Sequence, residues 1–374
     1  MSRRRTKVRY DRIIILLIVI VAFIGILFGV FNSTSVKNYF FSKKTGYSIE
    51  TVKVFREKDI LKDVSNNKYS NTLESAISSN NYIDKYLTDY LHIKYKDDKN
   101  FINNVNSLLE VGYNYNEINK IEDTLSNDSI EVIINSEYNK QLFDYLGLNY
   151  FKEDNLERYL NYYKDNNDME YEDIITFVNI GLDNEYYSNV IDIENQDDML
   201  VLVNKYHKLS SDYVPSDLET LSSKYAVGTQ KLRKEAMNKF MEMCDSAKED
   251  GINIKAGSTY RSYSYQQSLY NRYVNRDGKK EADRYSARAG YSEHQTGLAI
   301  DILNGKNEFI DEDNKEYDWL INNCYKFGYI LRYTKEEDIT GYQFEPWHFR
   351  YVGNDIAKEI HDTGLTYDEY MARK

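Results

Sequence analysis

Apolar residues fill one unbroken stretch near the start of the chain, whereas later stretches alternate apolar with polar positions. The first stretch, Ile13 to Phe31, is uncharged and has the length that a helix needs to cross roughly 30 Å of hydrocarbon. We interpret residues 13–31 as a transmembrane anchor. A cleaved signal peptide is the alternative, but the apolar run is long and no clear small-x-small cleavage site precedes Asn32.

The flank of this apolar run predicts its orientation. Residues 1–12 carry six basic side chains and one acid, Asp11. Positive flanks stay in the cytoplasm, so we expect a basic cytoplasmic tail at 1–12 and everything after Phe31 outside the membrane. Cys244 and Cys324 would then face an oxidising compartment. Both occupy apolar positions of predicted helices, which favours two buried thiols over a disulfide.

The middle of the chain shows helical periodicity without any cluster of catalytic residues. Residues 32–80 are polar and rich in Ser, Asn and Lys, which predicts a partly ordered stalk. Residues 81–195 contain a faint repeat: Tyr115-Asn-Glu-Ile118 returns approximately as Tyr171-Glu-Asp-Ile174. We predict a helical, repeat-like spacer domain there, with a ligand-binding repeat as the alternative.

From about residue 198 the pattern changes to interleaved strands and helices. Helical periodicity over 228–250 ends at Gly251, a Ser264 to Gln267 capping box predicts a second helix, and a third ends at Gly328. The expected fold class is therefore α+β. We predict a domain over 198–374 with a small, largely antiparallel sheet flanked by helices, preceded by a transmembrane helix and an α-helical repeat region.

Charge and cysteine content exclude two classes of protein. The formal net charge is −12 although the first residues are basic, so the body of the chain is strongly acidic. Nucleic-acid binding needs clustered Lys and Arg side chains, so we do not expect this chain to bind nucleic acid. With only two cysteines, a small disulfide scaffold is also excluded.

The alternating stretch after Gly297 predicts a strand in which an acidic residue shares one face with residues that have small side chains. Leu298, Ile300 and Ile302 share one face, so Asp301 lies on the other. His294 comes three residues before Gly297, close enough for the chain to return its imidazole to the Asp301 side.

A second histidine, His348, also lies in an alternating stretch that predicts a strand. In Glu345-Pro-Trp347-His348-Phe349, the aromatic residues point to the core and His348 to the opposite face. Two imidazoles and one carboxylate suit Zn²⁺ and leave its fourth position open for water. Glu345 is then placed to take a proton from that water.

These stretches resemble the motifs of a known family of zinc peptidases. Ser292-Glu-His294-Gln-Thr-Gly297-Leu-Ala299-Ile-Asp301 is similar to the first motif of the lysostaphin and D-Ala-D-Ala metallopeptidase group, and Glu345-Pro-Trp-His348 is similar to the second. The turn from Ser258 to Gln266 resembles the substrate-binding turn of VanY-type D-alanyl-D-alanine carboxypeptidases. The resemblance covers about residues 198 to 362.

The resemblance implies a role for each site residue. One Zn²⁺ per chain would be bound by His294, Asp301 and His348. Glu345 would be the general base, and Arg261 would polarise the scissile carbonyl or hold its oxyanion. Gln266 and Ser292, together with Arg261, would bind the peptide substrate.

The expected activity is removal of the C-terminal D-alanine from peptidoglycan stem peptides through a metal-bound water. The enzyme would be anchored in the membrane of a Gram-positive type of cell, with its catalytic domain outside. L,D-carboxypeptidase activity, endopeptidase activity on wall peptides and a non-catalytic wall-peptide-binding module are the alternatives. The sequence makes no prediction about oligomeric state.

Overall fold

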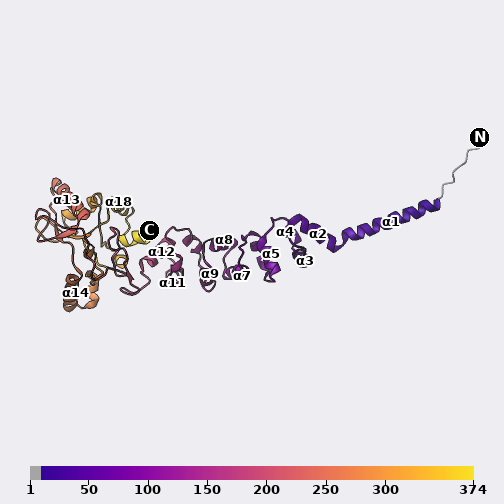
Figure 1. Ribbon diagram of the computed structural model, residues 1–374, viewed down its shortest axis with the longest axis horizontal. Helices are drawn as coiled ribbons and strands as arrows, with labels where there is room; N and C mark the ends of the chain where they lie inside the picture. Colours follow the sequence, from indigo (N-terminus) through magenta and orange to yellow (C-terminus); the bar gives the residue numbers. More distant parts are fainter. Residues whose placement is uncertain (1–9) are drawn as a thin grey trace, which may run out of the picture. The chain divides into compact units, whose positions relative to one another are not determined.

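The computed structural model describes residues 10–374, and contacts divide the chain into two compact units, Met1–Leu146 and Gly147–Lys374. The predicted cytoplasmic tail at 1–12 lies mostly outside the described residues. Figure 1 shows the elements in chain order.

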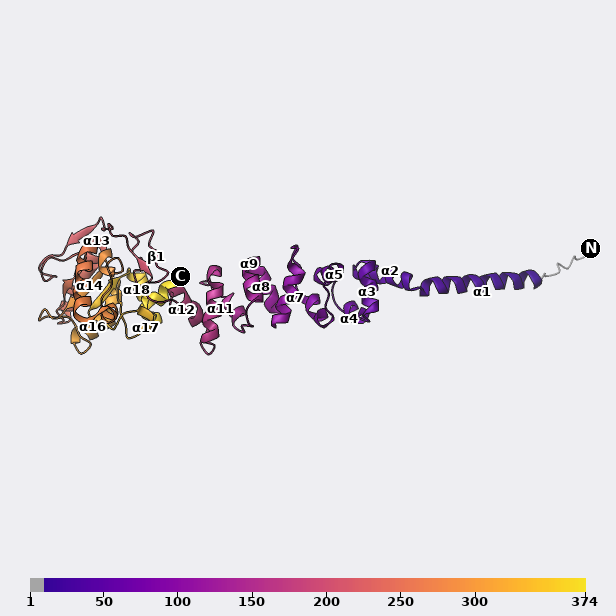
Figure 2. The same cartoon turned by 90° about the horizontal axis from the view of Figure 1, so that it is seen from below.

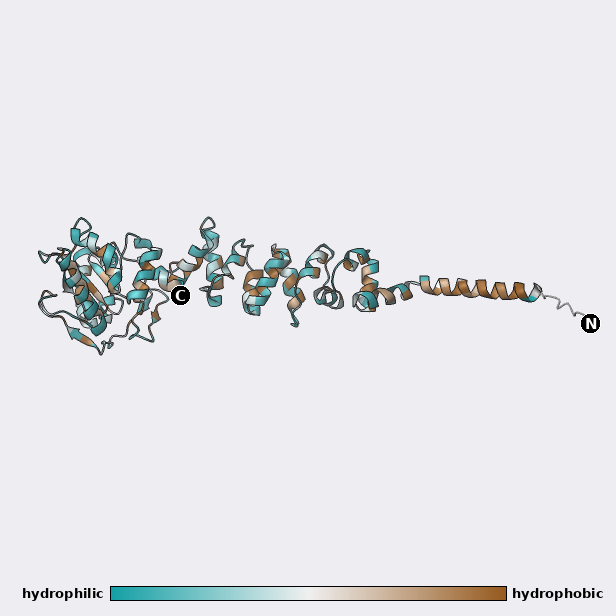
Figure 3. Cartoon of the chain, turned by 90° about the horizontal axis from the view of Figure 1, so that it is seen from above, coloured by the Kyte–Doolittle hydropathy of each residue, from teal (hydrophilic) through white to brown (hydrophobic). Residues whose placement is uncertain are grey.

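The first helix, α1 (Tyr10–Asn32), contains the apolar run and is coloured hydrophobic on every visible side in Figure 3. Its segment from Arg12 to Asn32 has a mean hydropathy of 3.5 and is not covered by other parts of the chain. By length and composition it is able to cross a membrane.

The rest of the first unit is also helical. Its elements are α2 (Thr34–Thr45), α3 (Ile49–Glu57), α4 (Leu61–Ser65), α5 (Asn71–Ser78), η1 (Asp84–Tyr86), α6 (Leu87–His92), α7 (Phe101–Val111), α8 (Tyr115–Thr124), α9 (Asn127–Ile134) and α10 (Leu142–Tyr145).

Residues 32–80, predicted as a partly ordered stalk, contain the helices α2 to α5. Ser48 and Ser70 cap α3 and α5 by accepting a hydrogen bond from a backbone N–H of the first turn. Val52, Phe55 and Leu73 are buried. Serine content predicts a flexible segment here, but these two serines are the N-cap residues of helices. The two-copy repeat stays a prediction.

The second unit contains helices, short strands and the main sheet. Its helices are η2 (Glu153–Asn155), α11 (Leu156–Asp165), α12 (Tyr171–Ile180), α13 (Lys234–Glu249), α14 (Tyr263–Asp277), α15 (Lys279–Tyr285), η3 (Glu293–Thr296), α16 (Lys315–Asn323), η4 (Cys324–Phe327), α17 (Glu337–Thr340), α18 (Asn354–Thr363) and α19 (Tyr367–Ala372). Its strands are β1 (Ile191–Asp192), β2 (His207–Lys208), β3 (Leu218–Thr220), β4 (Lys231–Arg233), β5 (Lys255–Ser258), β6 (Ala299–Leu303), β7 (Tyr329–Leu331) and β8 (His348–Tyr351).

The main sheet has the strand order β5-β6-β8-β7, and every neighbouring pair is antiparallel, as predicted. Figure 2 shows strands of the second unit among the helices labelled α14, α16 and α18. Leu298, Ile300 and Ile302 are fully buried in one apolar cluster that also contains Phe240 of α13 and Phe349 of β8. The predicted alternation of β6 is thereby confirmed, because one strand face meets a helix and the other is left for polar groups.

Two details differ from the sequence-based expectation. The helix expected over 228–250 begins at Lys234, because residues Lys231–Arg233 pair as β4 with β3. The second helix is capped by Ser262, which accepts a hydrogen bond from the N–H of Tyr265. The predicted capping box between Ser264 and Gln267 is therefore wrong. Ser262 and Ser264 are both residues of a type that commonly caps a helix, and the helix has Ser262 as its N-cap.

The second unit starts before the boundary predicted near 195, because α12 packs with the C-terminal helix α19. Asn179 donates a hydrogen bond to the carbonyl of Ala372, and Arg373 donates one from Nε to the hydroxyl oxygen of Thr176. The catalytic-domain limit at 198 stays a prediction. Cys244 and Cys324 are both buried free thiols.

Candidate metal centre and active site

Strand register brings the first two site residues together. Asp301 lies on the central strand β6, directly opposite His348 on β8, and Ser258 at the end of β5 pairs with Asp301 from the other side. Side chains that face each other across an antiparallel pair lie about 5 Å apart at Cβ. Asp301 and His348 therefore project from the same sheet face.

A tight turn returns His294 to the same place. The 3₁₀ helix η3 ends at Thr296 and is followed by its C-cap Gly297, whose φ of 67° is in the left-handed region that favours glycine. The chain then enters β6, and His294 Nε2 lies 3.3 Å from Asp301 Oδ2. The predicted return of the imidazole is confirmed.

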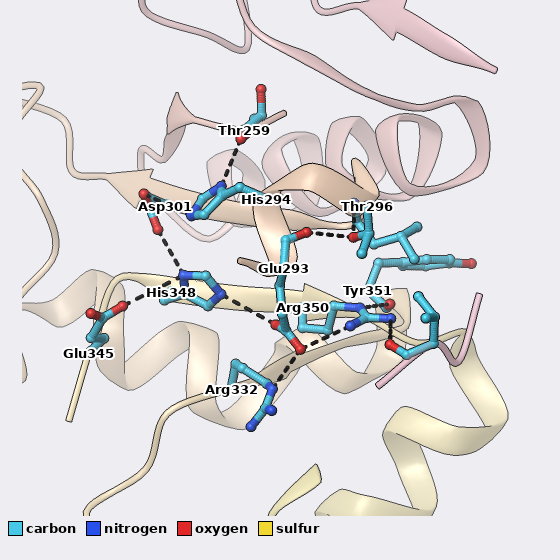
Figure 4. Close-up of polar contacts among 12 residues, drawn as sticks. Thr259, Glu293, His294, Thr296, Asp301, Arg332, Glu345, His348, Arg350 and Tyr351 are labelled. Atoms are coloured by element: carbon cyan, nitrogen blue, oxygen red, sulfur yellow. Dashed lines mark hydrogen bonds and ion pairs between the residues drawn. The ribbon is translucent and has the colours of Figure 1, made fainter. Parts of the chain in front are cut away.

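Hydrogen bonding fixes the tautomer of His294. Its Nδ1 lies 2.7 Å from the carbonyl oxygen of Thr259, which only accepts hydrogen bonds, so Nδ1 carries the proton (Figure 4). Nε2 then presents its lone pair towards Asp301. His348 approaches from the other side with Nδ1 3.0 Å from Asp301 Oδ1.

His294, Asp301 and His348 can each offer one ligand atom, and these atoms lie within 4.8 Å of one another. All three residues are buried. Two imidazole nitrogens and one carboxylate oxygen form a donor set that fits Zn²⁺.

The electrostatics of this cluster favour a cation. Burial lowers the pKa of His294 to about 4, and the nearby Arg261 acts in the same direction, so this ring is neutral at pH 7. Burial opposes charge on His348, but the carboxylates of Asp301 and Glu293 raise its pKa to about 9. A proton on His348 thus occupies the place where a metal ion would neutralise the same carboxylates.

Glu345 and Arg261 lie beside these three residues. Glu345 Oε2 is 3.7 Å from His348 Nδ1, and burial raises the pKa of Glu345 to about 7. Arg261 donates from Nη2 to Asp301 Oδ2 at 2.6 Å and from Nε to Ser258 Oγ at 3.0 Å. The guanidinium is therefore anchored on a predicted metal ligand, a contact that sequence spacing alone does not reveal.

A cavity of about 210 Å³ opens over the cluster. All of the predicted site residues line it: Arg261, Gln266, Ser292, His294, Asp301, Glu345 and His348. Gln266 donates from Nε2 to the carbonyl of Ala287, while its buried Oε1 has no hydrogen-bond partner in the part of the chain that the structure describes. Ser292 precedes η3 without capping it through its side chain. Both residues are thus available to a ligand in the cavity.

Sequence reasoning missed a buried charge cluster next to His348. Glu293, Arg332 and Arg350 have fully buried side chains, and the Glu293 carboxylate forms an ion pair with each of the two arginines. Arg350 follows His348 by two residues on β8, so strand alternation could have placed both on one face. Arg332 follows the end of β7 and has no comparable sequence signal.

Comparison with known proteins identifies the family. The pattern of a family described as VanY, D-alanyl-D-alanine carboxypeptidase, matches residues 229–354. The chain is 39% identical to "Putative carboxypeptidase YodJ" of Bacillus subtilis over 52% of this chain and 76% of that protein. It is 31% identical to the bifunctional D-Ala-D-Ala dipeptidase and D-Ala-D-Ala carboxypeptidase VanXYC of Enterococcus gallinarum, over 46% of this chain and 92% of that protein.

A solved structure of a variant of the vancomycin-resistance D,D-pentapeptidase VanY, in complex with Zn(II), is 33% identical with a TM-score of 0.42, covering 46% of this chain and 98% of that one. The identities and coverage of the two sequence relatives are sufficient to assign the family. The chain is a metallopeptidase that belongs to the VanY family of D-alanyl-D-alanine carboxypeptidases.

Proposed function

We propose that this chain is a membrane-anchored zinc carboxypeptidase that removes the C-terminal D-alanine from peptidoglycan stem peptides. The observation that carries the proposal is the convergence of His294, Asp301 and His348 beside Glu345 in the lining of one cavity. Membership of the VanY family supports the substrate class.

His294 Nε2, one oxygen of Asp301 and His348 Nδ1 would hold the zinc ion. When bound, zinc supplies Lewis acidity, which lowers the pKa of a water molecule and polarises a carbonyl oxygen. The Thr259 carbonyl keeps the proton of His294 on the far nitrogen and so leaves the ligating one free.

Glu345 would act as the general base and then as the general acid. Its Oε2 faces the ligand cluster, where it takes a proton from the attacking water and later gives it to the leaving D-alanine amine. A carboxyl whose pKa lies near 7 is well suited to hold this proton and to release it again.

Three further residues would bind the substrate. Arg261, fixed by Asp301 and Ser258, would direct its positive charge at the developing oxyanion. Gln266 Oε1 has an unused acceptor position for a peptide N–H, and Ser292 provides a hydroxyl in the same cavity.

The proposed location of the enzyme is supported by α1. An apolar helix from Arg12 to Asn32 preceded by basic residues supports an anchor with the catalytic unit outside the cell. Recovery of the full-length chain in the membrane fraction, with an intact N-terminus by mass spectrometry, would support this. A soluble product that begins after α1 would instead indicate a cleaved signal peptide.

The central test uses the purified full chain in detergent. Pentapeptide and tetrapeptide muropeptides are incubated with the zinc-loaded chain, and the products are identified by mass spectrometry. Loss of one D-alanine from the pentapeptide is expected, with activity removed by a chelator and restored by zinc. Loss of D-alanine from the tetrapeptide alone would indicate L,D-specificity, internal cleavage would indicate an endopeptidase, and binding without cleavage would indicate a non-catalytic module.

A further inference from the structure

The carboxylate of Glu293 lies in a fully buried cluster of charges (Figure 4). Its Oε1 accepts hydrogen bonds from Arg332 Nε at 2.8 Å and from Arg350 Nη1 at 2.9 Å. The side chains of all three residues have no exposed surface. A buried carboxylate beside two guanidinium groups is an acceptor and has no proton to donate.

The second oxygen of Glu293 faces His348. Oε2 lies 3.5 Å from His348 Nε2, and both atoms are buried without a hydrogen-bond partner among the described residues. Buried polar atoms are seldom left unpaired in proteins, so two facing unpaired atoms point to an interaction that a small shift would complete.

The arginines do not depend on Glu293 alone. Arg332 also donates from Nη1 to Asp368 Oδ2 at 2.7 Å. Arg350 donates to the backbone carbonyls of Met199, Val201 and Tyr351. A purely structural role of Glu293 as counter-ion therefore leaves Oε2, and its position opposite His348, without explanation.

We infer that Glu293 is a positioning residue that holds the proton of His348 on Nε2, so that Nδ1 presents its lone pair to the metal centre. This inference rests on the zinc site of the proposed function. The tautomer of each histidine is then set by an acceptor beside the nitrogen that does not bind the metal. The Thr259 carbonyl holds the proton of His294 on Nδ1, and the Glu293 carboxylate holds the proton of His348 on Nε2.

The test measures zinc affinity of the full chain in detergent, by competition with a chelator, for the wild type and for Glu293→Gln. Glutamine keeps the size of the side chain but offers one acceptor. When its oxygen faces the arginines, its NH₂ faces Nε2 and disfavours the required tautomer. We expect zinc binding to weaken about 10- to 100-fold. The visible spectrum of the Co²⁺-substituted chain should change as well.

The matched control is Asp368→Asn. Asp368 belongs to the same buried cluster but contacts Arg332 and Asn204 instead of His348. This variant should unfold at a lower temperature while its zinc affinity stays within about twofold of the wild type, because the contact with His348 is retained. Unchanged zinc affinity in Glu293→Gln, or an equal loss in both variants, would overturn the positioning role.

A second variant covers the case in which Glu293→Gln does not fold. Glu293→Asp keeps the negative charge beside the arginines but withdraws the carboxylate from Nε2 by one methylene, so weaker zinc binding is again expected, and wild-type affinity would refute the inference. Failure of the proposed function would appear differently, as zinc-loaded wild-type chain that releases no D-alanine.

Discussion

Glu345 is a buried carboxyl whose pKa depends on burial and on the charges around it. Burial raises its pKa to about 7, and the neighbouring His348 acts in the opposite direction. A general base works only when deprotonated, so a raised pKa means that activity is lost as the pH falls. We expect kcat/KM to decline on the acid side with a midpoint between about pH 5 and about pH 7, since a bound cation lowers the raised pKa of Glu345 only part of the way towards its ordinary value. A pH profile that stays flat down to about pH 5 would contradict this.

Replacing this carboxylate separates metal binding from proton transfer. Glu345→Gln keeps the size of the side chain and removes its basicity, so we expect kcat to fall about 10²- to 10⁴-fold. The zinc content, measured by elemental analysis of the purified chain, should remain close to one per chain. Loss of zinc together with activity would make Glu345 a ligand or a structural residue instead.

Arg261 offers a test of geometry at constant charge. Lysine cannot reproduce the fork that joins Asp301 Oδ2 and Ser258 Oγ. In Arg261→Lys we expect kcat to fall about 10- to 100-fold with a smaller change in KM, because the guanidinium is proposed to serve the transition state.

The control for this variant is Arg284→Lys, which changes an exposed arginine paired with Glu337 and should leave both kinetic constants unchanged. If Arg261→Lys also leaves kcat at the wild-type level, Arg261 has no role in the transition state.

At the scale of elements, the turn at Gly297 connects the histidine motif to the central strand. A Cβ added to Gly297 would lie 2.7 Å from Leu218 Cδ2, and its φ is 67°. Gly297→Ala combines backbone strain with a steric clash, and we expect it to lower the free energy of unfolding by about 3 kcal/mol.

Gly228 isolates the backbone contribution to that loss. Its φ of 69° is nearly the same, but nothing lies within 4 Å of an added Cβ. Gly228→Ala should therefore cost only about 1 kcal/mol. Equal losses in the two variants, measured by thermal unfolding, would show that packing around Gly297 contributes nothing.

The elements that could be predicted from the sequence are those with one buried face. Strands β6 and β8 alternate because one side meets the apolar cluster, so the opposite positions of Asp301 and His348 follow directly. The first residue of a helix is harder to predict from the sequence. Ser262 and Ser264 can both serve as an N-cap, and only tertiary packing decides that Ser262 does so. The Glu293 cluster was missed because strand alternation places only Arg350 beside His348, whereas Arg332 follows the end of β7 and has no periodic signal.

At the scale of the whole molecule, α19 links two parts of the second unit. It contacts α12 through Asn179 and Ala372, while Asp368 on the same helix accepts a hydrogen bond from Arg332. Residues 147–195 therefore belong to the same compact unit as the site, whereas the predicted spacer domain extends to residue 195. A catalytic fragment that begins at 198 would expose the face of α19 that α12 covers.

Two deletions test this division. All residues that line the cavity belong to the second unit, so removing residues 34–146 should leave hydrolysis of a soluble pentapeptide within about twofold of the full chain. Trimming of the wall in cells should fall, because the helices of the first unit are proposed to hold the enzyme away from the membrane. Extending the deletion to residue 195 should lower the unfolding temperature, since α19 loses its contacts with α12. If the shorter deletion abolishes soluble-peptide hydrolysis although the chain stays folded and binds zinc, the first unit contributes to the active site and the proposed spacer role is wrong.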